Sequence, residues 1–169
     1  MKASKNAYAL ITKFESCSLK AYKCPAGVPT IGFGHTSGVK MGDVIDMTKA
    51  LELLEEDVTV FARSLEKVLD AIEAHINQNQ FDALVSFVFN IGMGNFMKST
   101  MFDLLEKNES PEVIAKEFAK WNKARQGGRL VELKALLRDV AQKKSYFLHP
   151  SIWQTCRINF EMDLNAGLQ

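Results

Sequence analysis

Large apolar residues recur at spacings of three and four along one long stretch in the first half of the chain. The positions are Leu51, Leu54, Val58, Phe61, Leu65, Val68 and Ile72. Because residues three and four apart share a helix face, this spacing predicts one amphipathic helix over about residues 48–74, with Thr48 as its N-cap. At ~1.5 Å per residue, such a helix would span roughly 40 Å. A helix of that length crosses a small domain, so we expect it to connect two parts of the fold.

The segments before and after this helix have different patterns. Residues 30–36, TIGFGHT, alternate between two unlike sets of side chains, which predicts a β-strand whose Thr30 face carries little bulk. The turn-forming residues PAGVP precede this strand, so we expect a small β-hairpin. Residues 80–91, in contrast, are apolar almost all round, as in a helix that is buried on several sides.

These patterns predict an α+β fold that is mainly α, with a small hairpin lobe beside a helical bundle. Ser4 and Ser99 are expected to begin further helices, because serine side chains cap the first helical N–H groups. Ser110 followed by Pro111 is expected to start another, because proline suits the first helical position. A last helix is expected over about residues 131–147, after a turn at 126–129. The expected parts are the hairpin lobe at about 17–47, the long helix at about 48–74, a helical lobe at about 75–148 that includes the first helix, and a tail at 149–169.

The overall composition narrows the possible partners. The 169 residues carry a formal net charge of +1, so no basic field favours nucleic acid. No apolar run is long enough for membrane insertion, and the N-terminus lacks the pattern of a signal peptide. We therefore expect a monomer that is made in the cytoplasm. Three cysteines are an odd number, so at least one thiol stays free unless it pairs between chains.

One short segment collects residues that are suited to catalysis. Glu15 is followed after eight residues by Cys24 and after five more by Thr30, directly before IGFGHT. In this spacing the chain resembles the phage-type lysozymes, the endolysin glycosidases of T-even and lambdoid bacteriophages, which carry an aspartate at the Cys24 position. The resemblance covers about residues 4–147. Its further motifs are GDVIDMTKALELLEEDV at 42–58, FDALVSFVFNIGMGNFMKSTM at 81–101 and EFAKW at 117–121.

The resemblance implies hydrolysis of the β-1,4 bond between N-acetylmuramic acid and N-acetylglucosamine in peptidoglycan, without a cofactor or metal. Glu15 would protonate the leaving oxygen, while residue 24 and Thr30 would hold the attacking water, which is the layout of an inverting glycosidase. His35 would pair with Asp57 in a structural role. The expected substrate-binding residues are Gly32, Phe33, Asn90, Met93, Gly94 and Phe96.

Cys24 departs from the family pattern and leaves three interpretations open. In the first, the thiol replaces the carboxylate. An unperturbed thiol has a pKa of about 8.5, and a nearby Glu15 carboxylate would raise it further. A small thiolate fraction could also attack the anomeric carbon and give a retaining reaction. In the second, a disulfide to Cys17 or Cys156 switches the site off. In the third, catalysis is lost and the fold only binds glycan.

The implied activity sets the expected place of action. The enzyme would reach peptidoglycan strands in the periplasm or cell wall after release through a holin-type pore. The alternatives are an inactive lysozyme fold that binds peptidoglycan or a protein partner, and a lytic transglycosylase. A second departure lies in the last helix, which keeps one arginine, Arg138, where the family has a G-L-x-x-R-R-x-x-E-like run. Substrate contacts from that side are therefore left open.

Overall fold

The computed structural model describes residues 1–148 except 25, 122, 127, 128 and 133, and it gives only the backbone between 122 and 139. The tail at 149–169 and the side chain of Arg138 lie outside the described residues. In chain order the elements are α1 Lys5–Phe14, β1 Ser18–Lys23, β2 Pro29–Gly32, α2 Met47–Ala71, α3 Gln78–Ile91, α4 Met93–Phe96, α5 Thr100–Glu106, α6 Pro111–Glu117, η1 Phe118–Trp121, β3 Lys123–Gln126, β4 Arg129–Glu132 and α7 Lys134–Leu148. This is the predicted α+β class, mainly α.

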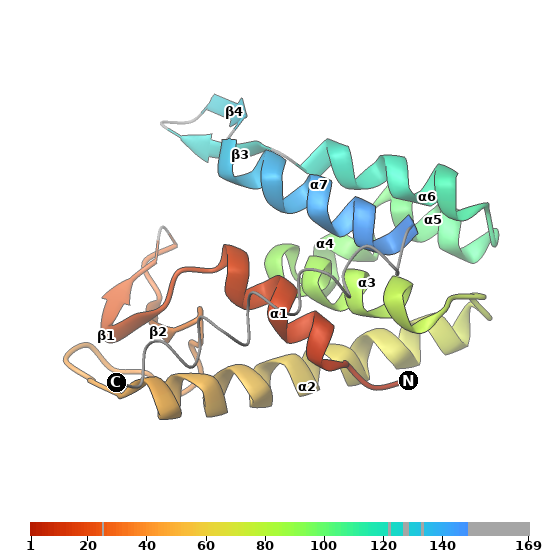
Figure 1. The fold of residues 1–169 in the computed structure, drawn as a ribbon. Helices are drawn as coiled ribbons and strands as arrows, with labels where there is room; N and C mark the ends of the chain where they lie inside the picture. Colours follow the sequence, from red (N-terminus) through yellow and green to blue (C-terminus); the bar gives the residue numbers. More distant parts are fainter. Residues whose placement is uncertain (25, 122, 127–128, 133, 149–169) are drawn as a thin grey trace.

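The long helix α2 begins slightly earlier than predicted and has a different cap. The Asp46 carboxylate accepts a hydrogen bond from the Lys49 N–H at 2.7 Å, so Asp46 and not Thr48 is the N-cap. The 25 residues of α2 span about 38 Å at ~1.5 Å per residue, from the hairpin lobe to the helical lobe (Figure 1). Leu51 lies outside the buried face of α2 and is exposed. The prediction included Leu51 because it considered only large apolar residues, whereas the buried face also contains alanines. That face consists of Ala50, Leu54, Val58, Ala62, Leu65 and Leu69.

The centre of the helical lobe is α3, in agreement with its apolar sequence. A capping box begins this helix: the Asn77 side chain accepts from the Gln80 N–H, and the Gln80 side chain accepts from the Asn77 N–H. The helix packs against α1, α2 and α7 (Figure 1). Burial by three neighbours explains why apolar residues occupy most of its circumference.

One carboxylate on α3, that of Asp82, is fully buried and anchors the N-terminal segment. It accepts hydrogen bonds from the Ser4 N–H at 2.9 Å, from the Ser4 hydroxyl at 2.5 Å and from Nε2 of Gln78 at 3.0 Å. Burial raises the pKa of Asp82, and these hydrogen bonds oppose the rise. Ser4 is also the predicted N-cap of α1, so the start of α1 is tied directly to α3.

Edge-to-face aromatic contacts hold the remaining helices of this lobe against α3. Phe87 contacts Phe118 and Trp121 of η1 at ring-centroid distances of 5.2 and 5.5 Å. Phe118 in turn contacts Phe147 of α7 at 5.6 Å. Such pairs contribute about 0.5–1.5 kcal/mol each beyond the burial of area. The cluster therefore fixes η1 and α7 relative to α3.

The N-terminal hairpin is shorter than predicted, because the chain reverses within TIGFGHT. β2 pairs with β1 in antiparallel fashion and ends at Gly32. Gly32 and Gly34 have φ angles of +62° and +105°, which glycine adopts without strain. The turn brings His35 back opposite Ile31, and the N–H of each donates to the carbonyl of the other at 2.9 Å. The prediction of one continuous strand over residues 30–36 was therefore wrong.

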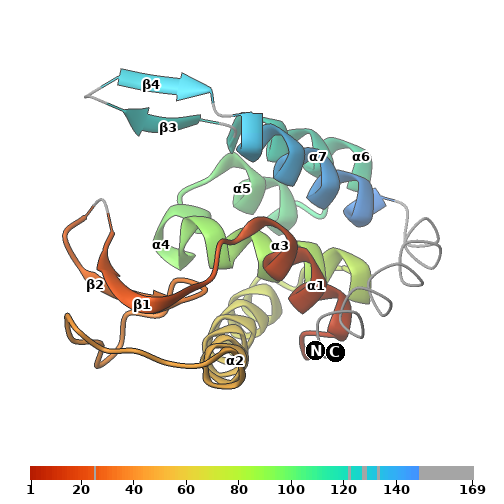
Figure 2. The ribbon, with the colours of Figure 1, turned by 60° about the vertical axis from the view of Figure 1, so that its left-hand side comes forward.

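A second hairpin, β3–β4, replaces the start of the predicted last helix. Its strands are antiparallel, with Gln126 opposite Arg129, and α7 begins only at Lys134. The predicted helix start at 131 was wrong, because Val131 pairs with Ala124 in this hairpin. Figure 2 shows both hairpins at the same end of the molecule, with α4 between them in this view.

Candidate active site

Glu15 lies where α1 ends and the chain turns toward the hairpin lobe. Its N–H donates to the Ile11 carbonyl at 2.9 Å, and its ψ of 130° ends the helix. The partly buried carboxylate accepts a hydrogen bond from Nδ2 of Asn90 at 3.0 Å. Asn90 belongs to the last turn of α3 and lies 75 residues further along the chain. This contact holds the Glu15 carboxylate in one orientation.

A cavity of about 590 Å³ opens beside Glu15. Its walls come from the turn after β2, from one face of α2 and from the end of α3. Phe61 and Phe89 meet edge to face there, at a ring-centroid distance of 5.6 Å. The lining residues are Glu15, Phe33, Gly34, His35, Thr36, Ser37, Glu56, Asp57, Val60, Phe61, Phe89 and Asn90. Polar groups around aromatic rings suit the binding of a ligand that has both hydroxyl groups and apolar faces.

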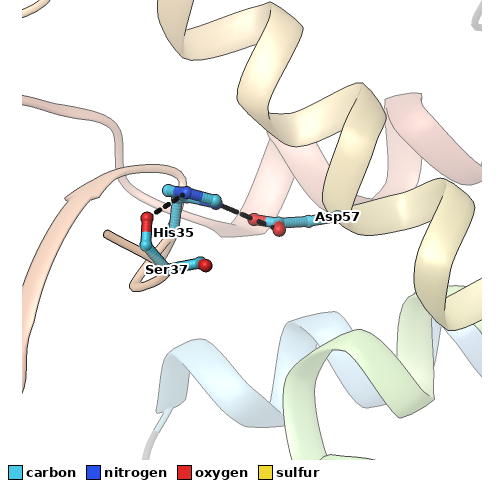
Figure 3. Close-up of polar contacts among 3 residues, drawn as sticks. All are labelled: His35, Ser37 and Asp57. Carbon is cyan, nitrogen blue, oxygen red and sulfur yellow. Dashed lines mark hydrogen bonds and ion pairs between the residues drawn. The ribbon is translucent and has the colours of Figure 1, made fainter. Parts of the chain in front are cut away.

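His35 and Asp57 make the expected contact between the hairpin lobe and α2. Nδ1 of His35 lies 3.0 and 2.9 Å from the two carboxylate oxygens of Asp57, and Nε2 lies 3.0 Å from the Ser37 carbonyl oxygen (Figure 3). The contacts therefore connect the turn after β2 with α2 through one imidazole ring. The side chains of His35 and Asp57 are 11% and 27% exposed, so water screens this contact only in part.

Cys24 and Thr30 lie together at the tip of the β1–β2 hairpin. The Gly27 N–H donates to the Cys24 carbonyl at 2.7 Å, and the Cys24 N–H donates to the Val28 carbonyl at 3.0 Å. The Thr30 hydroxyl also donates to the Val28 carbonyl, at 3.0 Å, and only 3% of Thr30 is exposed. These bonds fold the loop closely around the partly exposed Cys24 side chain.

The same loop changes the acidity of the thiol. Hydrogen bonds from the backbone N–H groups of Val28 and then Ala26 lower the pKa of Cys24. Desolvation opposes this lowering, and the weaker contributions of Thr30 and of the Gly27 N–H add to it. Glu15 is not among the groups that shift this pKa, so the rise expected from a neighbouring carboxylate is not seen. The loop favours the thiolate, the form that can accept a proton or act as a nucleophile.

Two of the predicted substrate-binding residues line the cavity and two are buried elsewhere. Phe33 and Asn90 are part of the cavity wall. Gly32 is buried against α2, where a Cβ would lie 3.7 Å from Ala50. Phe96 is 0% exposed and belongs to the helical core. In this structure both residues have packing roles, and a contact of Gly32 or Phe96 with substrate stays a prediction.

The face of α2 supplies cavity residues that the sequence patterns missed. Glu56 and Val60 are exposed, and Phe61 had been assigned to the buried stripe of the long helix. Helical spacing was the available signal, because Glu56 and Val60 are four residues apart and share a face. Met93 and Gly94, on α4, do not line this cavity, and their contact with substrate stays a prediction.

The remaining chemistry of the described residues is limited. Cys17 and Cys24 are both free thiols, and burial raises the pKa of Cys17. Cys156 lies outside the described residues. In the part of the chain that the structure describes, no three His, Cys, Asp or Glu residues form a group that could hold a metal ion. No helix among these residues is both long and apolar enough to cross a membrane.

The hairpin lobe, the long connecting helix and the helical lobe, with an acid beside the cavity, define a lysozyme-like protein. The family model of phage lysozyme matches residues 12–141. The chain is 37% identical over 147 residues to an endolysin of Acyrthosiphon pisum secondary endosymbiont phage 1, which covers 87% of this chain and 98% of that protein. The chain therefore belongs to the phage lysozyme family.

Further relatives and solved structures extend this similarity. The endolysin of Salmonella phage P22 is 38% identical over 133 residues, which are 73% of this chain and 86% of that protein. The muramidase domain of SpmX from Asticaccaulis excentricus has a TM-score of 0.80 and 32% identity, covering 88% of this chain and 99% of that chain. A P22 lysozyme variant has a TM-score of 0.69 and 34% identity, with the same coverage of 88% and 99%. Nearly the whole described chain therefore has a lysozyme-like fold.

Proposed function

We propose that this protein is a muramidase that hydrolyses the β-1,4 bond between N-acetylmuramic acid and N-acetylglucosamine in peptidoglycan and so lyses the bacterial cell wall. The observation that carries the proposal is the Glu15 carboxylate, which Asn90 holds beside a cavity of polar and aromatic side chains. Sugar rings bind to this combination through their hydroxyl groups and their apolar faces. Relatives named endolysin and a structure named a muramidase domain support the same activity.

In the proposed mechanism, Glu15 is the general acid. It donates its proton to the glycosidic oxygen as the bond to the anomeric carbon breaks, which neutralises the leaving group as charge develops. The Asn90 amide donates to Oε1 of Glu15, so the proton is carried on the other carboxyl oxygen, Oε2. Asn90 is in this view a positioning residue as well as a part of the cavity wall.

The attacking water is activated by Cys24 and Thr30 on the other face of the sugar. The Cys24 thiolate accepts a proton from this water, and the hydrogen-bond donors of its loop favour that ionised form. The Thr30 hydroxyl, which donates its proton to the Val28 carbonyl, orients the same water by accepting a hydrogen bond from it. Water that attacks opposite the leaving group inverts the anomeric centre, which requires about 6.5–9.5 Å between acid and base.

Other residues serve this reaction indirectly in the proposal. His35 and Asp57 brace the turn that carries Phe33, and Phe33 contacts the substrate. Met93 and Gly94 stay predicted contacts from α4. The monomeric state, the absence of nucleic-acid partners and a holin-type route to the wall also stay predictions.

The test is the clearing of Gram-negative cells that have been stripped of their outer membrane, followed as turbidity. Wild-type protein clears these cells, and Glu15→Gln lowers the rate by about 10²–10⁴-fold, the usual contribution of a general acid. The matched control is Glu106→Gln, an exposed acid at the end of α5, which keeps the wild-type rate. If reduced wild-type protein clears no cells at any pH near neutrality, the proposal is wrong and the alternative of a lysozyme fold without catalysis remains.

A further inference from the structure

We propose that Tyr22 binds the sugar ring whose anomeric carbon is attacked, an inference that rests on the proposed muramidase activity and deepens it. Tyr22 belongs to β1, which pairs with β2 in the first hairpin (Figure 2). The aromatic ring of Tyr22 stacks on the apolar face of this sugar. The inference makes Tyr22 a substrate-binding residue and gives it no part in proton transfer.

The register of the hairpin places Tyr22 beside the two groups that are proposed to activate the water. Tyr22 is the direct partner of Thr30 in the antiparallel ladder, so their side chains lie on the same face, with Cβ atoms roughly 4.5–5.5 Å apart. Cys24 lies two residues after Tyr22, and its N–H continues the ladder by donating to the Val28 carbonyl at 3.0 Å. The Cys24 thiol also contacts the Thr30 hydroxyl. One face of the hairpin therefore carries Tyr22, Cys24 and Thr30 together.

Tyr22 presents its ring to solvent and not to the core. Within the described residues, the hydrophobic core does not include Tyr22, and no hydrogen bond or ring contact involves its side chain. Tyr22 is 40% exposed, whereas its partner Thr30 is only 3% exposed. Tyrosine is enriched at binding interfaces, because its ring is apolar while its hydroxyl tolerates water. The ring is therefore available to a ligand that lies on this face of the hairpin.

The stereochemistry of the proposed reaction fixes which side of the sugar meets this face. Water that inverts the anomeric centre attacks opposite the leaving oxygen, so it approaches a β-linked sugar from its α face. In the chair form of such a sugar, the hydrogens on C1, C3 and C5 are axial and point to the α face, which makes that face apolar. A hairpin that holds the water at Cys24 and Thr30 therefore meets an apolar sugar face, and the ring of Tyr22 lies beside it.

The experiment measures binding separately from cleavage. The probe is a soluble tetrasaccharide of alternating N-acetylglucosamine and N-acetylmuramic acid, titrated by calorimetry into Glu15→Gln protein, which lacks the catalytic acid. Adding Tyr22→Leu to this protein should raise Kd by about three- to tenfold, because leucine keeps apolar bulk but lacks the aromatic face. Tyr22→Phe keeps the ring, so its Kd should stay within about twofold of that of the tyrosine protein.

Two further measurements distinguish substrate binding from a structural role. With Glu15 intact, Tyr22→Leu should lower kcat/KM by the same factor, with most of the loss in KM. The matched control is Tyr8→Leu, the same substitution in α1, where Tyr8 packs against the helical core. Tyr8→Leu should lower the unfolding temperature and leave Kd unchanged, whereas Tyr22→Leu should raise Kd and keep the unfolding temperature within about 2 °C.

Two results overturn the assignment of Tyr22. One is a Tyr22→Leu variant whose Kd stays within about twofold of that of the parent protein. The other is a Tyr22→Phe variant that loses as much affinity as Tyr22→Leu, because the hydroxyl and not the ring would then bind the substrate. A wild-type protein that binds the tetrasaccharide but cleaves no peptidoglycan would refute the muramidase activity, whereas an unchanged Kd in the Tyr22→Leu variant of a protein that does cleave would refute only the assignment of Tyr22.

Discussion

The substitution Cys24→Asp should raise the activity, because it replaces a partly ionised base with a fully ionised one. With a pKa of about 8.5, roughly 3% of a thiol is ionised at pH 7, so complete ionisation would raise the rate up to ~30-fold. The N–H groups of Val28 and Ala26 lower the pKa of Cys24 and enlarge its thiolate fraction. The gain should therefore lie below that limit.

The assay is the initial rate of cell clearing over a range of pH. The wild-type rate should rise as pH increases through the lowered pKa of Cys24, because the thiolate is the active base. This rise should be absent in Cys24→Asp, whose carboxylate is already ionised there. Cys17→Ser is the matched control, since it also removes a free thiol and should leave the pH profile unchanged.

Two results would contradict activation of the water by Cys24. One is a Cys24→Asp variant that is less active than Cys24→Ser, because a hydroxyl is a weaker base than a carboxylate at neutral pH. The other is an unchanged wild-type rate after the thiol of Cys24 has been alkylated with iodoacetamide. Either result would show that the ionised group at position 24 takes no part in the reaction.

Four further substitutions test contacts that stabilise the fold. His35→Gln and Asp57→Asn should each lower the free energy of unfolding in urea by about 1–3 kcal/mol, with a double variant less destabilised than their sum; strict additivity would exclude the contact. Burial raises the pKa of Glu117, but hydrogen bonds from Lys120 and Thr100 outweigh burial and hold this pKa below its usual value. The ionised Glu117 therefore stabilises the folded state, and this stabilisation should be lost as pH falls through the lowered pKa. In Glu117→Gln the free energy of unfolding should fall less steeply as pH is lowered. The same slope as in the wild type would argue against this role of Glu117. Phe87→Ala should cost about 3–5 kcal/mol in thermal unfolding, and a loss below ~1 kcal/mol would contradict the packing at α3.

Helices and helix caps that are determined by residues close together in the sequence could be predicted. Ser4 and Ser99 cap α1 and α5 with their side chains as expected, because a cap involves only one turn of chain. Ser110 also begins α6 as expected, with Pro111 in the first turn and no side-chain capping bond. The long amphipathic helix was also predicted. Its cap was missed because Asp46 and Thr48 are both good cap residues, and the first of them makes the bond to the Lys49 N–H.

Features that depend on backbone reversals or distant partners could not be predicted. In TIGFGHT the side chains alternate as in a strand, but the positive φ angles of Gly32 and Gly34 turn the chain instead. The contact between Asn90 and Glu15 joins residues 75 positions apart, and no local pattern reports it. The cavity residue Glu56 is likewise defined only once α2 packs beside the turn that follows β2.

The configuration of the new reducing end tests the proposed mechanism most directly. Proton NMR of a peptidoglycan fragment, recorded immediately after the enzyme is added, distinguishes the two anomers before they interconvert. Attack by water activated at Cys24 and Thr30, with Glu15 as the acid, predicts the α anomer as the first product of a β bond. An initial β anomer would show covalent attack by Cys24, and 1,6-anhydro ends would show a transglycosylase; either product would contradict the proposed mechanism.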